Sequence, residues 1–135
     1  MTSSSSEKAI NTDWVKLYKT TIKADFININ DIKVYYRFGR VHFDFTVNPE
    51  MLEDEYDQVV KKTKDSVVKE TISKLYGDQM SLRIKFDSKN DIYVYESSYW
   101  VPTEDINDNP NIMIENNFKV WYLKINDKPE IKMQF

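Results

Sequence analysis

The sequence predicts an α+β fold, in which a curled antiparallel sheet of about six to seven strands packs against one long amphipathic helix. Three observations lead to this prediction. Apolar and polar residues alternate along several short stretches, which is the spacing of strands with one buried face. Between residues 50 and 77, apolar residues instead recur every three or four positions, as in a helix with one buried face. A shorter helical pattern near the start predicts a short N-terminal helix.

Length and composition indicate one domain. The chain has 135 residues, of which 41% are hydrophobic and 30% are charged, so it can bury one sizeable core. A serine-rich start cannot offset its ordering entropy by burial, and we therefore assign residues 1–8 to a flexible leader. Residues 9–135 form the predicted domain. No apolar run approaches the roughly 20 residues that a membrane-spanning helix needs.

The first half of the domain predicts two helices separated by three strands. Trp14 is the main anchor of the first helix, whose apolar spacing starts at residue 9. Gly39 allows a positive φ between two alternating stretches and so predicts a hairpin. Asn48 and Pro49 predict the start of the long helix, because Asn caps free amides and Pro suits the first helical position. The predicted strands cover residues 21–29, 32–38 and 41–47, and the predicted long helix ends at Gly77.

Alternation returns after Gly77 and predicts four further strands. A polar turn around Asn90 joins the first two of them as a hairpin. These strands cover residues 80–86, 92–101, 118–125 and 131–135. Because the last strand has an exposed edge, we expect a monomer or an edge-paired dimer.

Cysteine content and charge exclude several classes of function. The chain has no Cys and one His, so Cys/His zinc sites, iron–sulfur clusters and Cys–His nucleophiles cannot form within it. We therefore expect no metal and no cofactor. The net charge of -3 provides no overall positive field for a polyanion, so duplex nucleic acid is not an expected partner.

A polar loop over residues 102–117 has half of a calcium-binding pattern. Its Asp105, Asn107 and Asn109 match the first, third and fifth positions of an EF-hand loop. Pro110 stands where the loop requires glycine, and Asn116 stands where it requires a bidentate Glu. The residues therefore predict a turn-forming loop, with weak calcium binding of another geometry left open.

His42 and Asp44 fall on one face of a predicted strand, an arrangement in which a carboxylate can orient an imidazole for acid–base work. Such pairs also occur on solvated sheet faces, and no serine in a nucleophile-elbow context accompanies this one. A minor enzymatic role of the pair is kept as an alternative.

The long strands near the carboxyl end are apolar or aromatic on both faces, which is more apolar surface than a one-sided core requires. Tyr and Trp are favoured in recognition surfaces because they bury a large area with few rotatable bonds. We predict an aromatic sheet face that contacts a partner, and cross-strand core packing is the alternative. The predicted binding residues are Tyr93, Tyr95, Tyr99, Trp121 and Tyr35.

Cations interleave with the aromatic residues, as in platforms for single-stranded nucleic acid. They are Lys33, Arg37, Arg83, Lys85 and Lys119. The net charge opposes this interpretation, and no RNP-type sequence supports it.

The leader, Ser3 to Ser6 followed by Glu7 and Lys8, resembles the tether of a mature Gram-positive surface lipoprotein. In those proteins the tether follows a lipidated cysteine, which this chain does not contain. The resemblance implies an extracytoplasmic location at the cell surface, with the membrane reached only through a lipid anchor. Small lipoproteins of this kind include inhibitory and exclusion proteins carried by mobile elements.

Together these features predict a noncatalytic extracytoplasmic binding domain, tethered as a lipoprotein, that contacts another envelope protein through its aromatic sheet face. Two alternatives stay open. The first is a carrier of a small apolar ligand, with a pocket between the sheet and the long helix. The second is a cytosolic regulatory protein or a mobile-element inhibitor.

Overall fold

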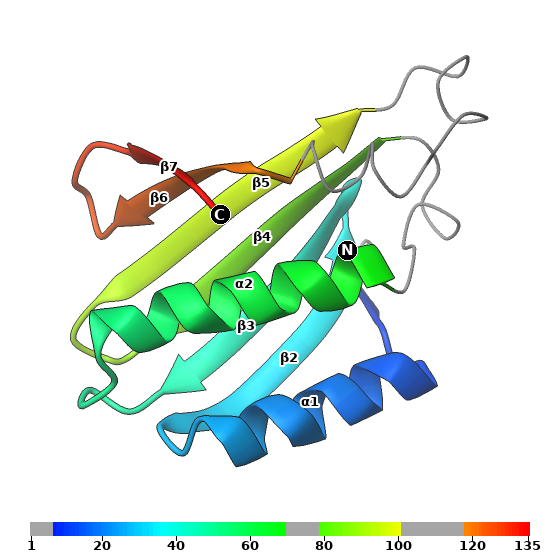
Figure 1. Ribbon diagram of the computed structural model, residues 1–135, viewed down its shortest axis with the longest axis horizontal. Coiled ribbons are helices and arrows are strands. Elements are labelled where there is room, and N and C mark those ends of the chain that lie inside the picture. Colours follow the sequence, from blue (N-terminus) through cyan, green and yellow to red (C-terminus); the bar gives the residue numbers. More distant parts are fainter. Residues whose placement is uncertain (1–6, 70–78, 101–117) are drawn as a thin grey trace, which may run out of the picture.

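The structure is a computed structural model that describes residues 7–69, 79–100 and 118–135 (Figure 1). For residues 68–69, 79–80 and 98–100 it gives the backbone alone. The elements follow one another as β1 (Lys8–Ala9), α1 (Asp13–Asp25), β2 (Ile29–Arg37), β3 (Arg40–Val47), α2 (Glu53–Lys69), β4 (Gln79–Asp87), β5 (Ile92–Trp100), β6 (Val120–Ile125) and β7 (Ile131–Gln134).

All seven strands form one sheet, in which they lie side by side in chain order. Neighbouring strands are antiparallel except β3 and β4, which run parallel and are joined across the sheet by α2 (Figure 1). Parallel neighbours need such a crossover because a tight turn cannot connect them. The predicted α+β class with a mostly antiparallel sheet is confirmed. The parallel pair was not predicted.

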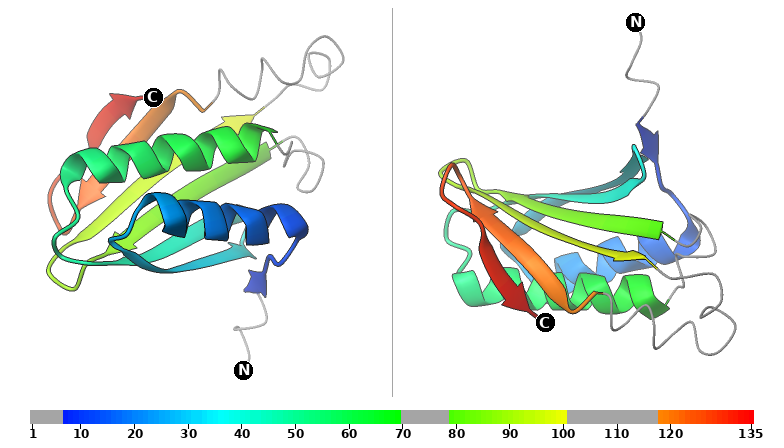
Figure 2. Two further views of the ribbon diagram at one scale, coloured as in Figure 1. Left: turned by 60° about the horizontal axis from the view of Figure 1, so that its bottom comes forward. Right: turned by 90° about the horizontal axis from the view of Figure 1, so that it is seen from above.

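Both helices pack on the same face of the sheet (Figure 2). The sheet curls, so that β6 and β7 at one end approach the level of α2. The described residues thus form two layers. One sheet face is covered by α1 and α2, and no described element covers the other.

The start of the domain differs from the prediction. Lys8 and Ala9 pair with Tyr36 and Tyr35 at the edge of β2, so the sheet includes the end of the predicted leader. Residues 1–6 lie outside the described residues. The strand predicted over residues 21–29 is wrong, because α1 runs to Asp25. Its buried stripe of Val15, Tyr18 and Ile22 continues the helical spacing through that region.

The second helix begins later than predicted. The amide of Met51 donates to the carbonyl of Asn48, so Asn48 and Pro49 form a turn ahead of α2. The Glu55 carboxylate accepts the backbone N–H of Leu52 at 3.1 Å, which marks Leu52 as the N-cap of α2. With 13 residues in α1 and 17 in α2, the prediction of one long and one short helix is wrong. Residues 70–78, which contain the predicted end at Gly77, lie outside the description.

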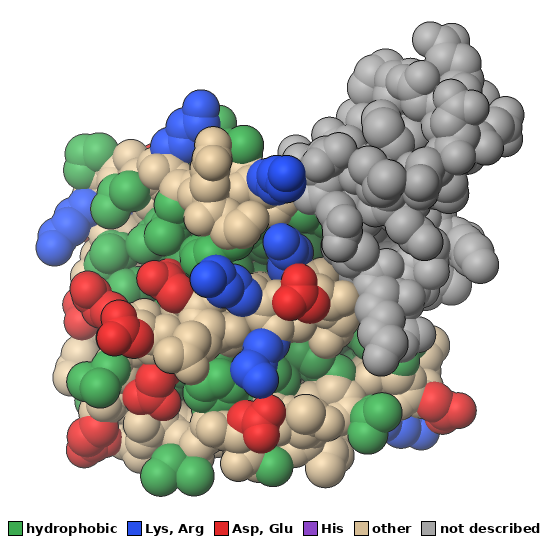
Figure 3. Space-filling view, in the orientation of Figure 1, with side chains coloured by type: hydrophobic (Ala, Val, Ile, Leu, Met, Phe, Trp, Pro, Cys, Tyr) green, Lys and Arg blue, Asp and Glu red, His purple; other side chains and the backbone are tan. Residues whose placement is uncertain are grey.

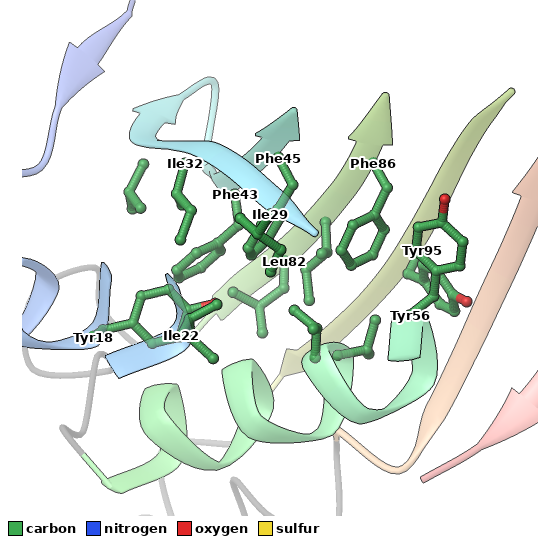
Figure 4. Packing of buried hydrophobic residues seen from close by; sticks show 14 of the residues in the cluster. Tyr18, Ile22, Ile29, Ile32, Phe43, Phe45, Tyr56, Leu82, Phe86 and Tyr95 are labelled. Carbon is green, nitrogen blue, oxygen red and sulfur yellow. The ribbon is translucent and has the colours of Figure 1, made fainter. Parts of the chain in front are cut away.

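The core fills the space between the sheet and the two helices (Figure 4). Phe43, Ile84 and Phe86 from the central strands are fully buried there, as is Val59 of α2. A buried polar contact also connects the two helices. The hydroxyl of Tyr18 contacts that of Thr63, which joins α1 to α2.

Candidate functional site

The sheet face opposite the helices is the candidate site, and we call it the helix-free face. Successive side chains of a strand point to opposite faces, so Val41, Phe43 and Phe45 of β3 face the helices while His42 and Asp44 face away. Directly paired residues of neighbouring strands point to the same face of the sheet, so the pairing register identifies the other residues of the helix-free face. Among the described side chains, the helix-free face consists of Ala9, Asp31, Lys33, Tyr35, Arg37, Arg40, His42, Asp44, Thr46, Ser81, Arg83, Lys85, Asp87, Ile92, Val94, Glu96, Val120, Tyr122, Lys124, Lys132 and Gln134.

One row of side chains crosses this face from β2 to β7. Each member is the direct cross-strand partner of the next. In order, the row is Tyr35, His42, Arg83, Glu96, Tyr122 and Lys132. Aromatic and charged groups therefore lie next to one another from β2 to β7.

Tyr35 and His42 form a small packed centre on the face. Their rings are stacked, with centroids 4.6 Å apart and 5° between the planes. The Lys33 ammonium lies 5.0 Å from the centroid of the Tyr35 ring, within cation–π range. His42 is only 8% exposed although no described helix covers it. The neighbouring side chains of the face therefore bury it.

Asp44 is bound to Tyr35 rather than to His42. The Tyr35 hydroxyl donates to Oδ2 of Asp44 at 2.9 Å. Burial, together with the hydrogen bond and charge of Asp44, raises the pKa of Tyr35 to about 12, so the phenol is protonated at neutral pH. Nδ1 of His42 and Oδ1 of Asp44 are buried and have no hydrogen-bond partner among the described residues. The arrangement predicted for acid–base work, with Asp44 orienting His42, is not formed at Nδ1.

The charge state of His42 follows from its surroundings. Burial lowers the pKa of the imidazole below its ordinary value; the carboxylate of Asp44 opposes this, and three arginines add to it. These are Arg83, Arg40 and Arg37. His42 is accordingly a neutral, polar group at pH 7, close enough to one carboxylate and three permanent cations to interact with their charges.

A shallow hollow opens beside this centre, where β4, β5 and β6 meet. It measures about 160 Å³, and Arg40, Ser81, Glu96 and Tyr122 contribute to its walls. Arg40 and Glu96 form an ion pair across it, with 3.0 Å between Nη1 and Oε2. The strand order explains why these two residues meet. Arg40 lies on β3 and Glu96 on β5, so only β4, which carries Arg83, separates them.

The structure divides the predicted aromatic residues between the two sheet faces. Tyr35 lies on the helix-free face, whereas Tyr95 and Trp121 are core residues that are 2% and 0% exposed. The Tyr95 hydroxyl donates to Asp57 of α2, and the Trp121 indole donates to the carbonyl of Phe118. These two side chains therefore do not lie on a surface.

The other two predicted residues lie on β5. Tyr93 is half-buried and stacks on Tyr56 of α2, with ring centroids 4.5 Å apart. The Tyr99 side chain is outside the described residues, as is the whole of the predicted loop over residues 102–117.

The interleaved cations noted in the sequence are largely brought together. Lys33, Arg37, Arg83 and Lys85 all lie on the helix-free face, and Lys119 precedes β6. The sequence reasoning missed Arg40, Glu96 and Tyr122. Their only common signal is cross-strand register, which depends on pairings between distant segments.

Two further findings limit the chemistry of the described residues. Within residues 7–69, 79–100 and 118–135, no group of three or more His, Asp or Glu side chains is placed to hold a metal ion. No helix in these ranges has the length and apolar character to cross a membrane.

No protein-family profile matches the chain, and neither a curated protein nor a solved structure is significantly similar to it.

Proposed function

We propose that this protein is a noncatalytic binding domain and that its helix-free face binds another protein. The observation that carries the proposal is the sheet face itself, which extends over β2 to β7 and is covered by no described helix or strand. Its centre is already ordered, because Tyr35 is stacked on His42 and hydrogen-bonded to Asp44. Side chains held in place before binding lose little entropy when a partner arrives.

The kind of exposed aromatic group favours a protein over a nucleic acid. Single-stranded nucleic acids bind to sheets through several free aromatic rings on which bases stack. Here the Tyr35 ring is covered by His42, while Tyr122 is 42% exposed beside the hollow. A single tyrosine surrounded by polar groups is typical of the anchor residue of a protein interface.

The location of this activity is also a proposal. The serine run ahead of β1 supports display outside the membrane through a lipid tether. Fractionation of the source cells tests it. Recovery in the detergent-soluble envelope fraction is the expected result, and recovery in the cytosol would favour the regulatory or inhibitor alternative.

Site-directed photo-crosslinking tests the binding face. A photoreactive amino acid replaces Tyr122 on the helix-free face or, as the matched control, Leu17, which is exposed on α1. We expect irradiation of the source cells to give one adduct of defined mass at position 122 and none at position 17. Adducts only at position 17, or none at either position, would refute the proposed face.

A further inference from the structure

Charge is unevenly distributed between the two sides of the molecule. The helix-free face carries the cations Lys33, Arg37, Arg40, Arg83, Lys85, Lys124 and Lys132, against the carboxylates Asp31, Asp44, Asp87 and Glu96, and Glu7 adds a fifth carboxylate through its ion pair with Lys33. The whole chain nevertheless has a net charge of -3. Carboxylates gather instead on the helix side, at the first turn of α2 (Figure 3). The local field of the helix-free face therefore has the opposite sign to the net charge.

The arginines of this face are grouped around one point. Arg83 is the cross-strand partner of His42, Arg40 lies two residues before His42 on the same strand, and Arg37 pairs with Arg40 at the hairpin. Guanidinium groups present a planar fork of donors that matches the two oxygens of a carboxylate. A neutral imidazole among them does not add to their mutual repulsion.

One wall of the hollow beside these arginines is formed by a replaceable group, the carboxylate of Glu96. Glu96 binds Arg40 at 3.0 Å, and both side chains are partly exposed. An ion pair in contact with water contributes little to stability, so an incoming carboxylate can replace Glu96 at small cost. The Glu96 carboxylate thus shows which chemical group can bind Arg40 beside the hollow.

We propose that the cluster of Arg37, Arg40 and Arg83 binds carboxylate side chains of an acidic segment of a partner protein, one of which takes the place of Glu96 on Arg40. This inference rests on the proposed function and names the chemistry of the partner. Charge complementarity with the basic face selects the acidic segment. Tyr122 at the wall of the hollow covers the apolar part of that segment.

Fluorescence anisotropy with a labelled oligoglutamate peptide tests the cluster, at about 50 mM salt so that screening is weak. The double variant Arg40→Gln/Arg83→Gln is expected to bind at least about tenfold more weakly than the wild type. The control Lys16→Gln/Lys61→Gln removes the same charge from the exposed helix side and is expected to change affinity less than about twofold. Equal losses in both double variants, or no binding by the wild type, would overturn the proposal.

A third variant separates binding from a folding defect. Glu96→Gln frees Arg40, and we expect it to raise affinity for oligoglutamate by up to about fivefold. A damaged fold cannot produce this gain, and an unchanged or lower affinity in a folded variant would contradict the displacement step. A single-stranded oligothymidylate of equal charge serves as the second probe. Tighter binding of the oligonucleotide than of the peptide would refute an acidic protein segment in favour of a nucleic acid.

Failure of this inference is distinguishable from failure of the proposed function. If the adduct at position 122 persists in the Arg40→Gln/Arg83→Gln protein and oligoglutamate does not bind, the face binds a protein but not through these arginines. If the peptide binds through the cluster and position 122 gives no adduct in cells, the chemistry of the cluster holds and the proposed protein partner does not.

Discussion

The imidazole of His42 lies flat on the phenol ring of Tyr35, with 4.6 Å between the ring centroids, on the side of the sheet that carries no described helix. Outward-facing side chains in a two-layer α+β fold are usually solvated, and a buried aromatic pair there needs polar neighbours to close around it. Lys33, Asp44 and the nearby arginines supply them. The helix-free face therefore has a fixed centre, which a binding surface benefits from and a merely solvated face does not need.

Replacement of Tyr35 by Phe tests the hydrogen bond that holds this centre. Tyr35→Phe keeps the ring stack but removes the donor to Oδ2 of Asp44, whose Oδ1 already lacks a partner among the described residues. We expect the free energy of unfolding to fall by about 1 to 2 kcal/mol in urea titrations. Tyr122→Phe, on the same face but exposed, is the control and is expected to change it by less than about 0.5 kcal/mol. Equal effects of the two changes would contradict a structural role of the Tyr35 hydroxyl.

The contact between Tyr18 and Thr63 joins the helices through buried hydroxyls. Oγ1 of Thr63 donates to the carbonyl of Val59, so the Tyr18 hydroxyl donates to Thr63. Thr63→Val leaves the Tyr18 hydroxyl buried without an acceptor, and we expect it to lower the free energy of unfolding by about 1 to 3 kcal/mol.

A second substitution checks this cause. Adding Tyr18→Phe to Thr63→Val removes the unsatisfied hydroxyl, so the double variant is expected to be more stable than Thr63→Val alone. Thermal unfolding of the wild type, both single variants and the double variant measures the coupling. Additive losses would show that the two hydroxyls act independently.

Trp121 is expected to be a core residue in experiment as well. Trp121→Ala removes a side chain that is 0% exposed and that packs edge-on against Phe135. We expect a loss of about 3 to 5 kcal/mol in the free energy of unfolding. Tyr122→Ala, one residue further along and on the opposite face, is the matched control, with an expected loss of about 1 kcal/mol or less. A Trp121 variant as stable as the Tyr122 variant would contradict the observed burial.

Local signals in the sequence predicted the β2–β3 hairpin but not the parallel pairing of β3 with β4. Alternation and a glycine with φ of +72° at Gly39 are properties of neighbouring residues. The pairing of His42 with Arg83 depends instead on where α2 packs on the sheet. No spacing within either strand contains that information, so the row of side chains across the helix-free face could not be predicted from the sequence.

The aromatic residues of β5 show a second limit. Alternation correctly indicates that Tyr93 and Tyr95 share a face, but β5 is apolar on both sides, so the sequence does not reveal which side is covered. In the structure, contacts with other elements show which face of β5 is covered. Tyr95 packs edge-on against Phe86 and donates to Asp57, which places its face under α2. Arg40 and Glu96 then fall on the other face, where the sequence analysis had named Tyr35, His42 and Asp44 but neither of these two residues.

The single histidine makes the pH dependence of the helix-free face measurable. Burial lowers the pKa of His42 in the folded protein, while in the unfolded chain the imidazole titrates near its ordinary value of about 6.5. As the pH falls below that value, the unfolded state binds a proton that the folded state does not yet bind. The stabilisation from neutral His42 is therefore complete above pH of about 6.5 and is lost as the pH falls through the lowered folded-state pKa.

His42→Gln removes this titration and keeps a polar side chain on the strand. We expect urea midpoints of the wild type to fall more steeply than those of His42→Gln between pH of about 7 and 5, because carboxylate titrations common to both proteins cancel in the comparison. The imidazole proton resonance, unique in a chain with one His, gives the folded-state pKa directly. A folded-state pKa of His42 at or above that of an unfolded peptide would show that the imidazole is solvated or paired with a carboxylate. The packed centre around Tyr35 would then not persist in solution.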